Sequence, residues 1–122
     1  MSRRGRWRVD LSAPAEDDIE AILRYTAERF GVAQMRRYEG LMAAALVRLQ
    51  GGPDAPGARR RDDLGAGIRL LHIGQRGRPA RHFVVFRVVE GPGRPTIRVV
   101  RILYDAMDLA RHLGAEDEPA GE

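Results

Sequence analysis

Two adjacent segments rich in β-branched and aromatic residues constrain most strongly what this chain can fold into. They occupy residues 81–88 and 96–104 and are joined by a stretch rich in glycine and proline at 90–95. This composition predicts two neighbouring antiparallel β-strands. Neither segment alternates cleanly between apolar and polar residues, and strands of this kind need apolar contacts on both faces of their sheet.

The direction of each apolar side chain follows from the two-residue repeat of a strand. In the first segment, the repeat assigns Phe83 and Val85 to one face and Val84, Phe86 and Val88 to the other. In the second segment, it assigns Ile97, Val99 and Leu103 to one face and Val100 and Ile102 to the other. Both predicted strands therefore carry apolar side chains on both faces.

The first half of the chain predicts a strand and two helices. Residues 7–11 alternate between apolar and polar, which indicates a short strand. Ser12 is a suitable helix cap, and apolar residues at helical spacing predict a helix from there to Gly31 and a second helix over residues 33–50. Because so short a link joins them, we expect an antiparallel hairpin. The apolar positions are Ile19, Ile22, Leu23, Thr26 and Phe30 in the first helix, and Met35, Tyr38, Leu41, Met42, Ala45, Leu46 and Leu49 in the second.

The remaining segments complete an α+β fold. Residues 51–66 predict a loop, residues 68–73 a strand, and residues 106–112 a short terminal helix. We therefore predict a helical hairpin packed on one face of a four-stranded, mostly antiparallel, twisted sheet. A single domain is expected over residues 1–114, followed by an acidic tail at 115–122 that is predicted to be disordered.

This architecture leaves one face of the predicted sheet without helices. Leaving apolar side chains of that face in water forfeits burial worth about 1.5–3 kcal/mol for each large residue. A contiguous exposed apolar patch usually marks a binding surface. We therefore expect a partner segment, or a second copy of the chain, to cover this face.

Composition restricts the class of site and the kind of partner. The chain has no cysteine, which excludes disulfides, thiolate metal sites and thiol nucleophiles, and it has no apolar stretch of the roughly 20 residues that cross a membrane. No apolar run of a signal peptide follows the basic start, so a cytoplasmic location is expected. All 21 basic residues are arginine, and 12 of them lie between Arg59 and Arg111 against five acids. That basic half suggests an anionic partner, either a nucleic acid or an acidic protein segment.

Several short phrases, in their order along the chain, resemble the RelE/ParE toxins of bacterial type II toxin–antitoxin systems. They lie at residues 31–38, 67–69 and 86–88, and above all at residues 101–108, which read RILYDAMD. The resemblance covers residues 7–113. It departs from the family pattern at Tyr104, where members usually carry histidine.

The resemblance implies one of two activities. ParE-like members inhibit DNA gyrase by protein–protein binding, and RelE-like members cleave messenger RNA on the ribosome. The chain has no lysine for the basic pairs typical of RelE-like sites, and arginine is a poor proton donor or acceptor because its pKa lies above about 12. This favours the ParE-like branch without catalytic residues, cofactor or metal. The alternatives are a RelE-like ribosome-dependent endoribonuclease and an inert partner-binding module.

Each alternative has its own candidate residues. The nuclease would use Arg69, Arg87 and Arg101 to neutralise charge and Tyr104, His72 or His82 to move protons. Arg87 and Arg101 are equally consistent with structural ion pairs to Asp105, Asp108 or Glu39. The residues predicted to contact a target or antitoxin are Arg59, Arg60, Arg61, Val84, Phe86, Arg87, Arg101, Tyr104, Met107 and Asp108.

The partners that the resemblance implies are two proteins. One is a ParD-like antitoxin whose acidic helical segment would lie along an apolar groove, with its carboxylates pairing with the surplus arginines. The other is DNA gyrase as the target. No membrane contact is expected, and direct nucleic-acid binding is expected only through the antitoxin or under the nuclease alternative.

Overall fold

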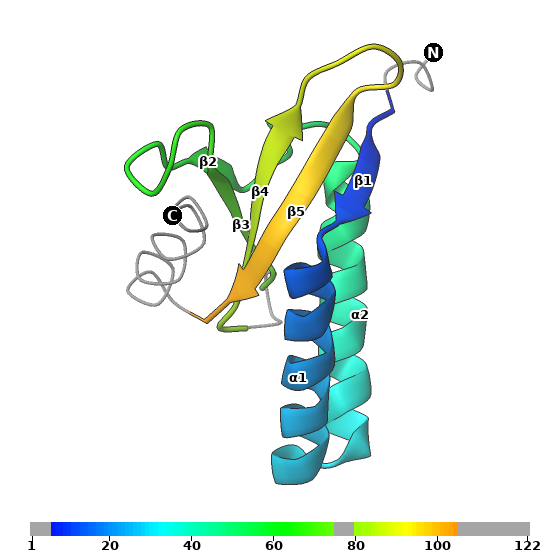
Figure 1. Ribbon diagram of the computed structural model, residues 1–122. Helices are drawn as coiled ribbons and strands as arrows, with labels where there is room; N and C mark the ends of the chain where they lie inside the picture. The colour runs from blue at the N-terminus through cyan, green and yellow to red at the C-terminus, as the bar shows by residue number, and fades with distance from the viewer. Residues whose placement is uncertain (1–5, 75–79, 105–122) are drawn as a thin grey trace.

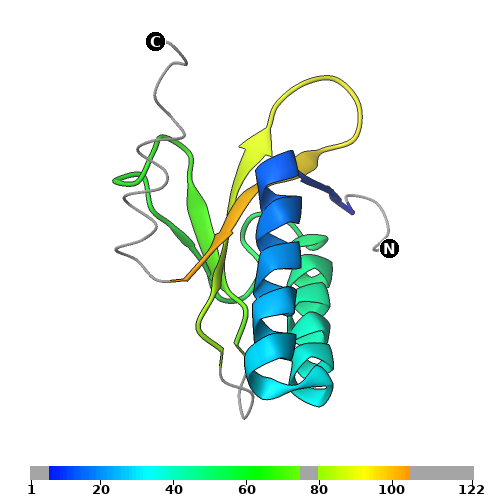
Figure 2. The same cartoon turned by 60° about the horizontal axis from the view of Figure 1, so that its bottom comes forward.

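The computed structural model describes residues 6–74 and 80–104, which form a five-stranded mixed sheet with two helices on one face (Figure 1). The elements are strand β1 (Arg8–Leu11), helices α1 (Ala13–Phe30) and α2 (Val32–Leu49), and strands β2 (Ala58–Arg60), β3 (Arg69–His72), β4 (Phe83–Val89) and β5 (Thr96–Leu103). The strand order is β1-β5-β4-β3-β2, with β1 parallel to β5 and the other neighbours antiparallel. Figure 2 shows the two helices packed side by side, so the predicted fold class is confirmed.

The sheet has one strand more than the sequence predicts. Residues 58–60 fall within the predicted loop, but they pair with β3 in the register Ala58↔Leu71 to Arg60↔Arg69. Three residues are too few for an alternating pattern to show, so only the pairing with β3 identifies this strand. The predicted terminal helix at 106–112 and the predicted tail at 115–122 lie outside the described residues.

The helical hairpin begins and turns at residues that the sequence identifies. The Ser12 Oγ accepts a hydrogen bond of 3.1 Å from the Ala15 amide, which caps α1. Gly31 joins the helices with a φ of 94°, a conformation that glycine adopts without strain. The turn of the hairpin projects beyond the strands (Figure 1). Phe30 therefore lies outside the core and is 64% exposed, although its spacing predicts a buried position.

The main core fills the space between the helices and the sheet. Its centre is made by residues of α2 and of the inner face of the sheet, and β1 and α1 contribute partly buried side chains around it. The fully or almost fully buried members are Ala15, Leu41, Met42, Ala45, Leu49, Leu71, Ile73, Val84, Phe86, Ile97, Val99 and Ile102. This core holds the helical hairpin against the sheet. It thereby positions the exposed residues that lie where the helices meet the sheet.

A β-bulge near the end of β5 changes the face on which its last residues lie. The pairing with β4 shifts by one residue between Val85 and Phe86, and the extra residue on β5 is Val100. Ile102 consequently lies in the core under the helices, and Leu103 lies in a cluster on the opposite face. The strict alternation used on the sequence assigns both of these residues to the wrong faces.

The face of the sheet opposite the helices, called here the outer face, carries a smaller core of its own. Ile68, Leu70, Val85 and Leu103 are each at most 6% exposed, and Leu64, from the connection between β2 and β3, packs against them. The sequence predicts an exposed apolar patch on this face. That prediction is wrong for these four residues, because the chain itself buries them.

Candidate functional site

A groove lined by aromatic side chains runs between α1, the start of α2 and the end of β5. It encloses about 780 Å³. Its exposed residues include Tyr25 at 55%, Phe30 at 64% and Tyr104 at 43% exposure. Large apolar side chains are usually buried in soluble proteins. Three exposed aromatics around one concavity therefore mark this groove as the candidate binding surface.

A short hydrogen bond closes the floor of the groove. The Tyr38 hydroxyl of α2 lies 2.6 Å from His82 Nδ1, and the Arg81 amide donates to the same hydroxyl at 3.1 Å. The Tyr38 hydroxyl can both accept a hydrogen bond and donate its own proton, so the donor across the Tyr38–His82 contact depends on which imidazole nitrogen carries the proton.

Burial sets the ionisation of this pair. Desolvation lowers the pKa of His82 below its usual 6.5; the Asp18 carboxylate opposes this shift, and His72 adds to it. Desolvation also raises the pKa of Tyr38 above its usual 10.0, although the hydrogen bond from the Arg81 amide acts in the opposite direction. Both groups are therefore held in their neutral forms at pH 7.

Tyr104, a predicted site residue, lies at the rim of this groove. Its hydroxyl accepts a hydrogen bond of 3.1 Å from the Arg81 guanidinium, and its ring meets that of His82 edge to face at 5.3 Å between centroids. Arg81 thus links Tyr38 and Tyr104 across the groove. The sequence placed Tyr38 in the helical stripe, but it contains no local signal that joins Tyr38 to residues 81 and 82.

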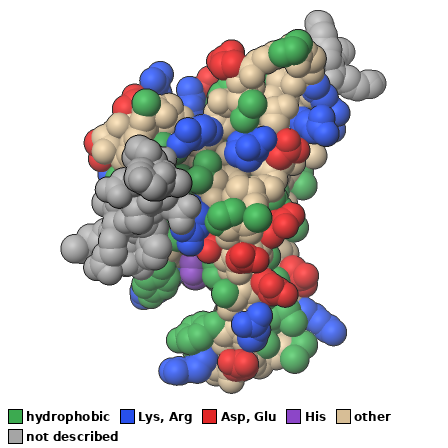
Figure 3. All heavy atoms as spheres, viewed as in Figure 1, with side chains coloured by type: hydrophobic (Ala, Val, Ile, Leu, Met, Phe, Trp, Pro, Cys, Tyr) green, Lys and Arg blue, Asp and Glu red, His purple; other side chains and the backbone are tan. Residues whose placement is uncertain are grey.

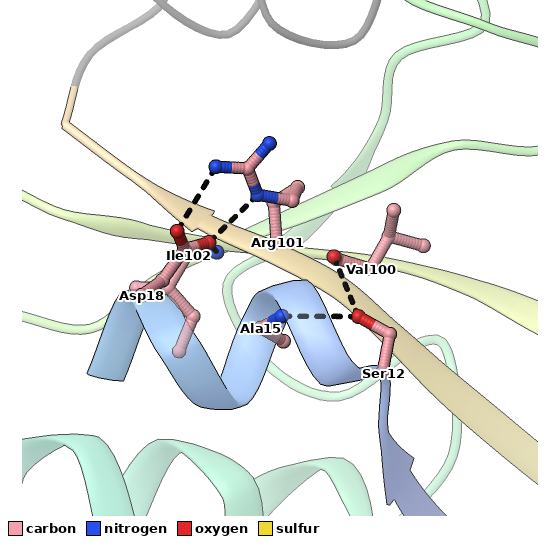
Figure 4. Close-up of polar contacts among 6 residues, drawn as sticks. All are labelled: Ser12, Ala15, Asp18, Val100, Arg101 and Ile102. Carbon is pink, nitrogen blue, oxygen red and sulfur yellow. Dashed lines mark hydrogen bonds and ion pairs between the residues drawn. The ribbon is translucent and has the colours of Figure 1, made fainter. Parts of the chain in front are cut away.

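Arg101 is held by an acid that the sequence analysis did not name. The Asp18 carboxylate of α1 accepts from Arg101 Nε at 2.8 Å, from a terminal nitrogen of the same guanidinium at 2.9 Å, and from the Ile102 amide at 2.9 Å (Figure 4). The Arg101 and Asp18 side chains are only 13% and 15% exposed. This bidentate ion pair holds α1 against β5, and the Asp18 carboxylate neutralises the positive charge of Arg101.

The same edge of β5 is completed by the helix cap. β1 pairs with β5 only from Thr96 to Val99. Beyond that point, Ser12 Oγ donates to the Val100 carbonyl at 2.9 Å, as Figure 4 also shows. The beginning of α1 therefore satisfies backbone groups that β1 is too short to reach.

The residues predicted for RNA cleavage are brought together only in part: the rings of His82 and Tyr104 are in contact, but Arg69 lies apart from Arg87. Arg69 pairs in register with Phe86 of the inner core, and its guanidinium donates to the Pro53 carbonyl and to Asp54 at 3.0 and 2.8 Å. Arg87 follows Phe86 and so lies on the opposite face of β4. His72 lies in β3, where its Nδ1 accepts from the Gly74 amide at 3.0 Å. The three predicted arginines therefore do not all face one position.

The other predicted contact residues fall into three groups. Arg60 and Arg61 pair with Asp62 and Asp63 at 3.1 and 2.9 Å, and Arg59 lies on the outer face in register with Leu70. Val84 and Phe86 are fully buried under the helices, so their predicted role as contact residues is wrong for this conformation. Met107 and Asp108 lie outside the described residues.

Two further classes of feature are absent from the described part of the chain. Within residues 6–74 and 80–104, no three His, Asp or Glu side chains converge in a way that could hold a metal ion. Neither described helix combines the length and apolar character that a bilayer requires.

Known proteins are similar to this chain in sequence or in fold. A family model described as the ParE toxin of type II toxin–antitoxin system, parDE, matches residues 9–109. Toxin ParE of Escherichia coli is 33% identical over 103 residues, covering 84% of this chain and 89% of that protein. Toxin ParE1 of Mycobacterium tuberculosis (strain H37Rv) is 33% identical over 106 residues, covering 87% and 97%. A chain from the chromosomal ParDE TA system of P. aeruginosa has the same fold, with a TM-score of 0.66 at 18% identity, covering 84% of this chain and 99% of that one.

Proposed function

The chain belongs to the ParE toxin family of type II toxin–antitoxin systems, and on this basis we propose that it inhibits DNA gyrase in the cytoplasm and is neutralised by a cognate antitoxin. The inhibition works through protein–protein binding. The observation that carries the proposal is the family match over residues 9–109, which covers both helices and the five described strands except for Arg8, the first residue of β1. The RelE-like alternative has less support, because Arg69 lies on the opposite face of the sheet from Arg87 and is held by Asp54.

The test uses the purified protein and purified gyrase in a supercoiling assay. Increasing toxin should reduce the supercoiling of relaxed plasmid, and prior addition of the antitoxin should restore it. In the same preparation, messenger RNA on translating ribosomes should stay intact. Unchanged supercoiling at a large molar excess of toxin, together with cleaved messenger RNA, would contradict the proposal and favour the nuclease.

The aromatic groove is the surface proposed for the antitoxin. An amphipathic helix places apolar anchors at i, i+3, i+4 and i+7 into a groove of this kind. Tyr25 and Phe30 are exposed anchors on α1 for such a helix, and Arg29 lies over the Tyr25 ring at 5.7 Å from its centroid. Arg81 adds a second guanidinium at the lining, where it can pair with acidic residues of the antitoxin.

Substitutions on α1 test this assignment against a matched control. Tyr25→Ala and Phe30→Ala together should weaken antitoxin binding at least about 30-fold, because a buried aromatic anchor contributes about 2 kcal/mol or more. The control is Val47→Ala, at an apolar side chain on α2 that is 61% exposed and does not line the groove. Equal affinities of the double variant and the control, measured by calorimetry, would show that the antitoxin binds elsewhere.

A further inference from the structure

Arginines are concentrated on the outer face of the sheet by its register. Arg87 of β4 stands directly opposite Arg98 of β5, and Arg59 of β2 lies on the same face in the row of Leu70 and Val85. The register therefore places these arginines on one surface, where a single anionic partner can contact several of them.

Acidic residues neutralise only part of the positive charge on this face. Among the described strand residues, Asp10 of β1 is the one acid in register with the arginines, beside Arg98. Its carboxylate lies 3.3 Å from Arg8 Nε, and both side chains are well exposed, at 39% and 59%. Exposed pairs of this kind contribute little and exchange partners readily. Asp18 reaches Arg101 from α1, but Arg59 and Arg98 remain exposed.

This face offers a partner more charge than apolar surface. Ile68, Leu70 and Val85 are at most 3% exposed, and the partly buried apolar side chains beside them are Leu64, Phe83 and Val100. An amphipathic protein segment would find less apolar surface there than in the aromatic groove. A polyanion needs none, because guanidinium groups bind phosphate oxygens through charge and paired N–H donors.

The dimensions of the face also suit an extended polyanion. From β1 to β2 the sheet spans four strand spacings, or about 19 Å at roughly 4.8 Å each. Arginine side chains are seen over the strands in the space-filling view of Figure 3. Duplex DNA carries one negative charge for about every 1.7 Å of its axis, so several phosphates can face a surface of this width.

We propose that the outer face of the sheet binds the phosphate backbone of duplex DNA, through Arg8, Arg59 and Arg98, without reading its sequence. Arg87 lies beside Arg98 in the strand register. The basic composition of residues 59–111 suggests an anionic partner, but the sequence does not show which arginines share a face, because they come together only through the strand register. This binding to DNA does not depend on gyrase. A role of the bound DNA in holding a gyrase–DNA complex rests on the proposed function.

The test measures the fluorescence anisotropy of a labelled duplex with the purified full chain at several salt concentrations. Three phosphate contacts predict an affinity about 40-fold lower at 200 mM than at 50 mM salt, because each contact contributes about 0.9 to the logarithmic salt slope. Arg59→Gln with Arg98→Gln should leave one contact and reduce that salt effect to about 3.5-fold. Two duplexes of unrelated sequence should bind equally well.

A charge-matched variant shows whether the salt dependence of DNA binding comes from the position of the arginines or from the net charge of the protein. Arg24→Gln with Arg36→Gln removes the same charge from exposed positions on α1 and α2, and should retain the full salt slope. All four positions are exposed, so both double variants should keep the circular dichroism spectrum of the parent. Equal slopes for the two double variants would overturn the proposal.

Binding of polyglutamate without binding of the duplex would also overturn it, and would assign the face to an acidic protein segment. A DNA-binding chain that leaves gyrase unaffected would refute only the proposed function.

Discussion

The contact between Asp18 and the end of β5 gives the sharpest prediction for stability. One carboxylate accepts three hydrogen bonds, two from the Arg101 guanidinium and one from the Ile102 amide. Asp18→Ala removes all three acceptor contacts. Arg101 loses the carboxylate that pairs with its guanidinium, and the Ile102 amide loses this acceptor.

The expected loss can be estimated from the burial of the pair. Breaking a buried ion pair by deleting one partner costs about 3–5 kcal/mol. Because the two side chains retain 13% and 15% exposure, water relieves part of this cost, and we expect about 3 kcal/mol. For a small protein with a urea m-value of about 1–3 kcal/mol/M, the unfolding midpoint should fall by about 1–3 M.

The assay is urea unfolding at pH 7, with Asp17→Ala as the control. Asp17 is the exposed neighbour of Asp18 on α1, so Asp17→Ala removes the same charge and side-chain type from the same helix without removing the contact that Asp18 makes with β5. The difference between the two variants therefore isolates the contact with β5. A difference below about 1 kcal/mol at equal m-values would refute the reasoning, since surface substitutions alone stay within about 0.5 kcal/mol.

Three further predictions concern the core, the cap and the buried histidine. Phe86→Ala should destabilise the fold by about 3–5 kcal/mol in urea, because it opens a cavity under the helices; a cost below about 1 kcal/mol would contradict its place in the core. Ser12→Ala should cost about 1–2 kcal/mol, because the hydroxyl caps α1 and also bonds the Val100 carbonyl, and an unchanged thermal midpoint would contradict both roles. Burial lowers the pKa of His82 below 6.5. At a pH between the folded and the unfolded pKa, the unfolded chain therefore binds a proton at His82 that the folded chain does not bind. Stability should therefore fall as the pH drops below about 6.5 and level off below the folded pKa; His82→Gln should remove that part of the slope, and identical pH profiles would refute the assignment.

Local patterns in the sequence are sufficient for the helices and the long strands. Ser12 and Gly31 mark the ends of α1 through cap chemistry that acts within a few residues, and both are found in those roles. The faces of Val84 and Phe86 follow from a simple two-residue repeat, which holds along β4. Such signals are reliable because the same neighbouring residues that carry the pattern also form the structure.

The parts that escape prediction depend on contacts between distant residues. Asp18 and Arg101 are 83 positions apart, and Tyr38 and His82 are 44 positions apart, so no periodic pattern connects them. The bulge at Val100 depends on which residues of β4 lie opposite, and this reverses the predicted faces of Ile102 and Leu103. The separation of Arg69 from Arg87, on which the choice between the two activities depends, is likewise visible only from the register.

The parallel pairing of β1 with β5 has a consequence for how the toxin is made. Arg8 pairs with Thr96, and the intervening segment contains both helices and three other strands. Synthesis at about 5–20 residues per second delivers β5 roughly 4–18 s after β1. During that interval β1 has no neighbour in the sheet, and α1 lacks the contacts that Ser12 and Asp18 make with β5. Premature termination anywhere before β5 should therefore yield a chain that cannot close its sheet, so nonsense mutations late in the gene should abolish toxicity as completely as early ones.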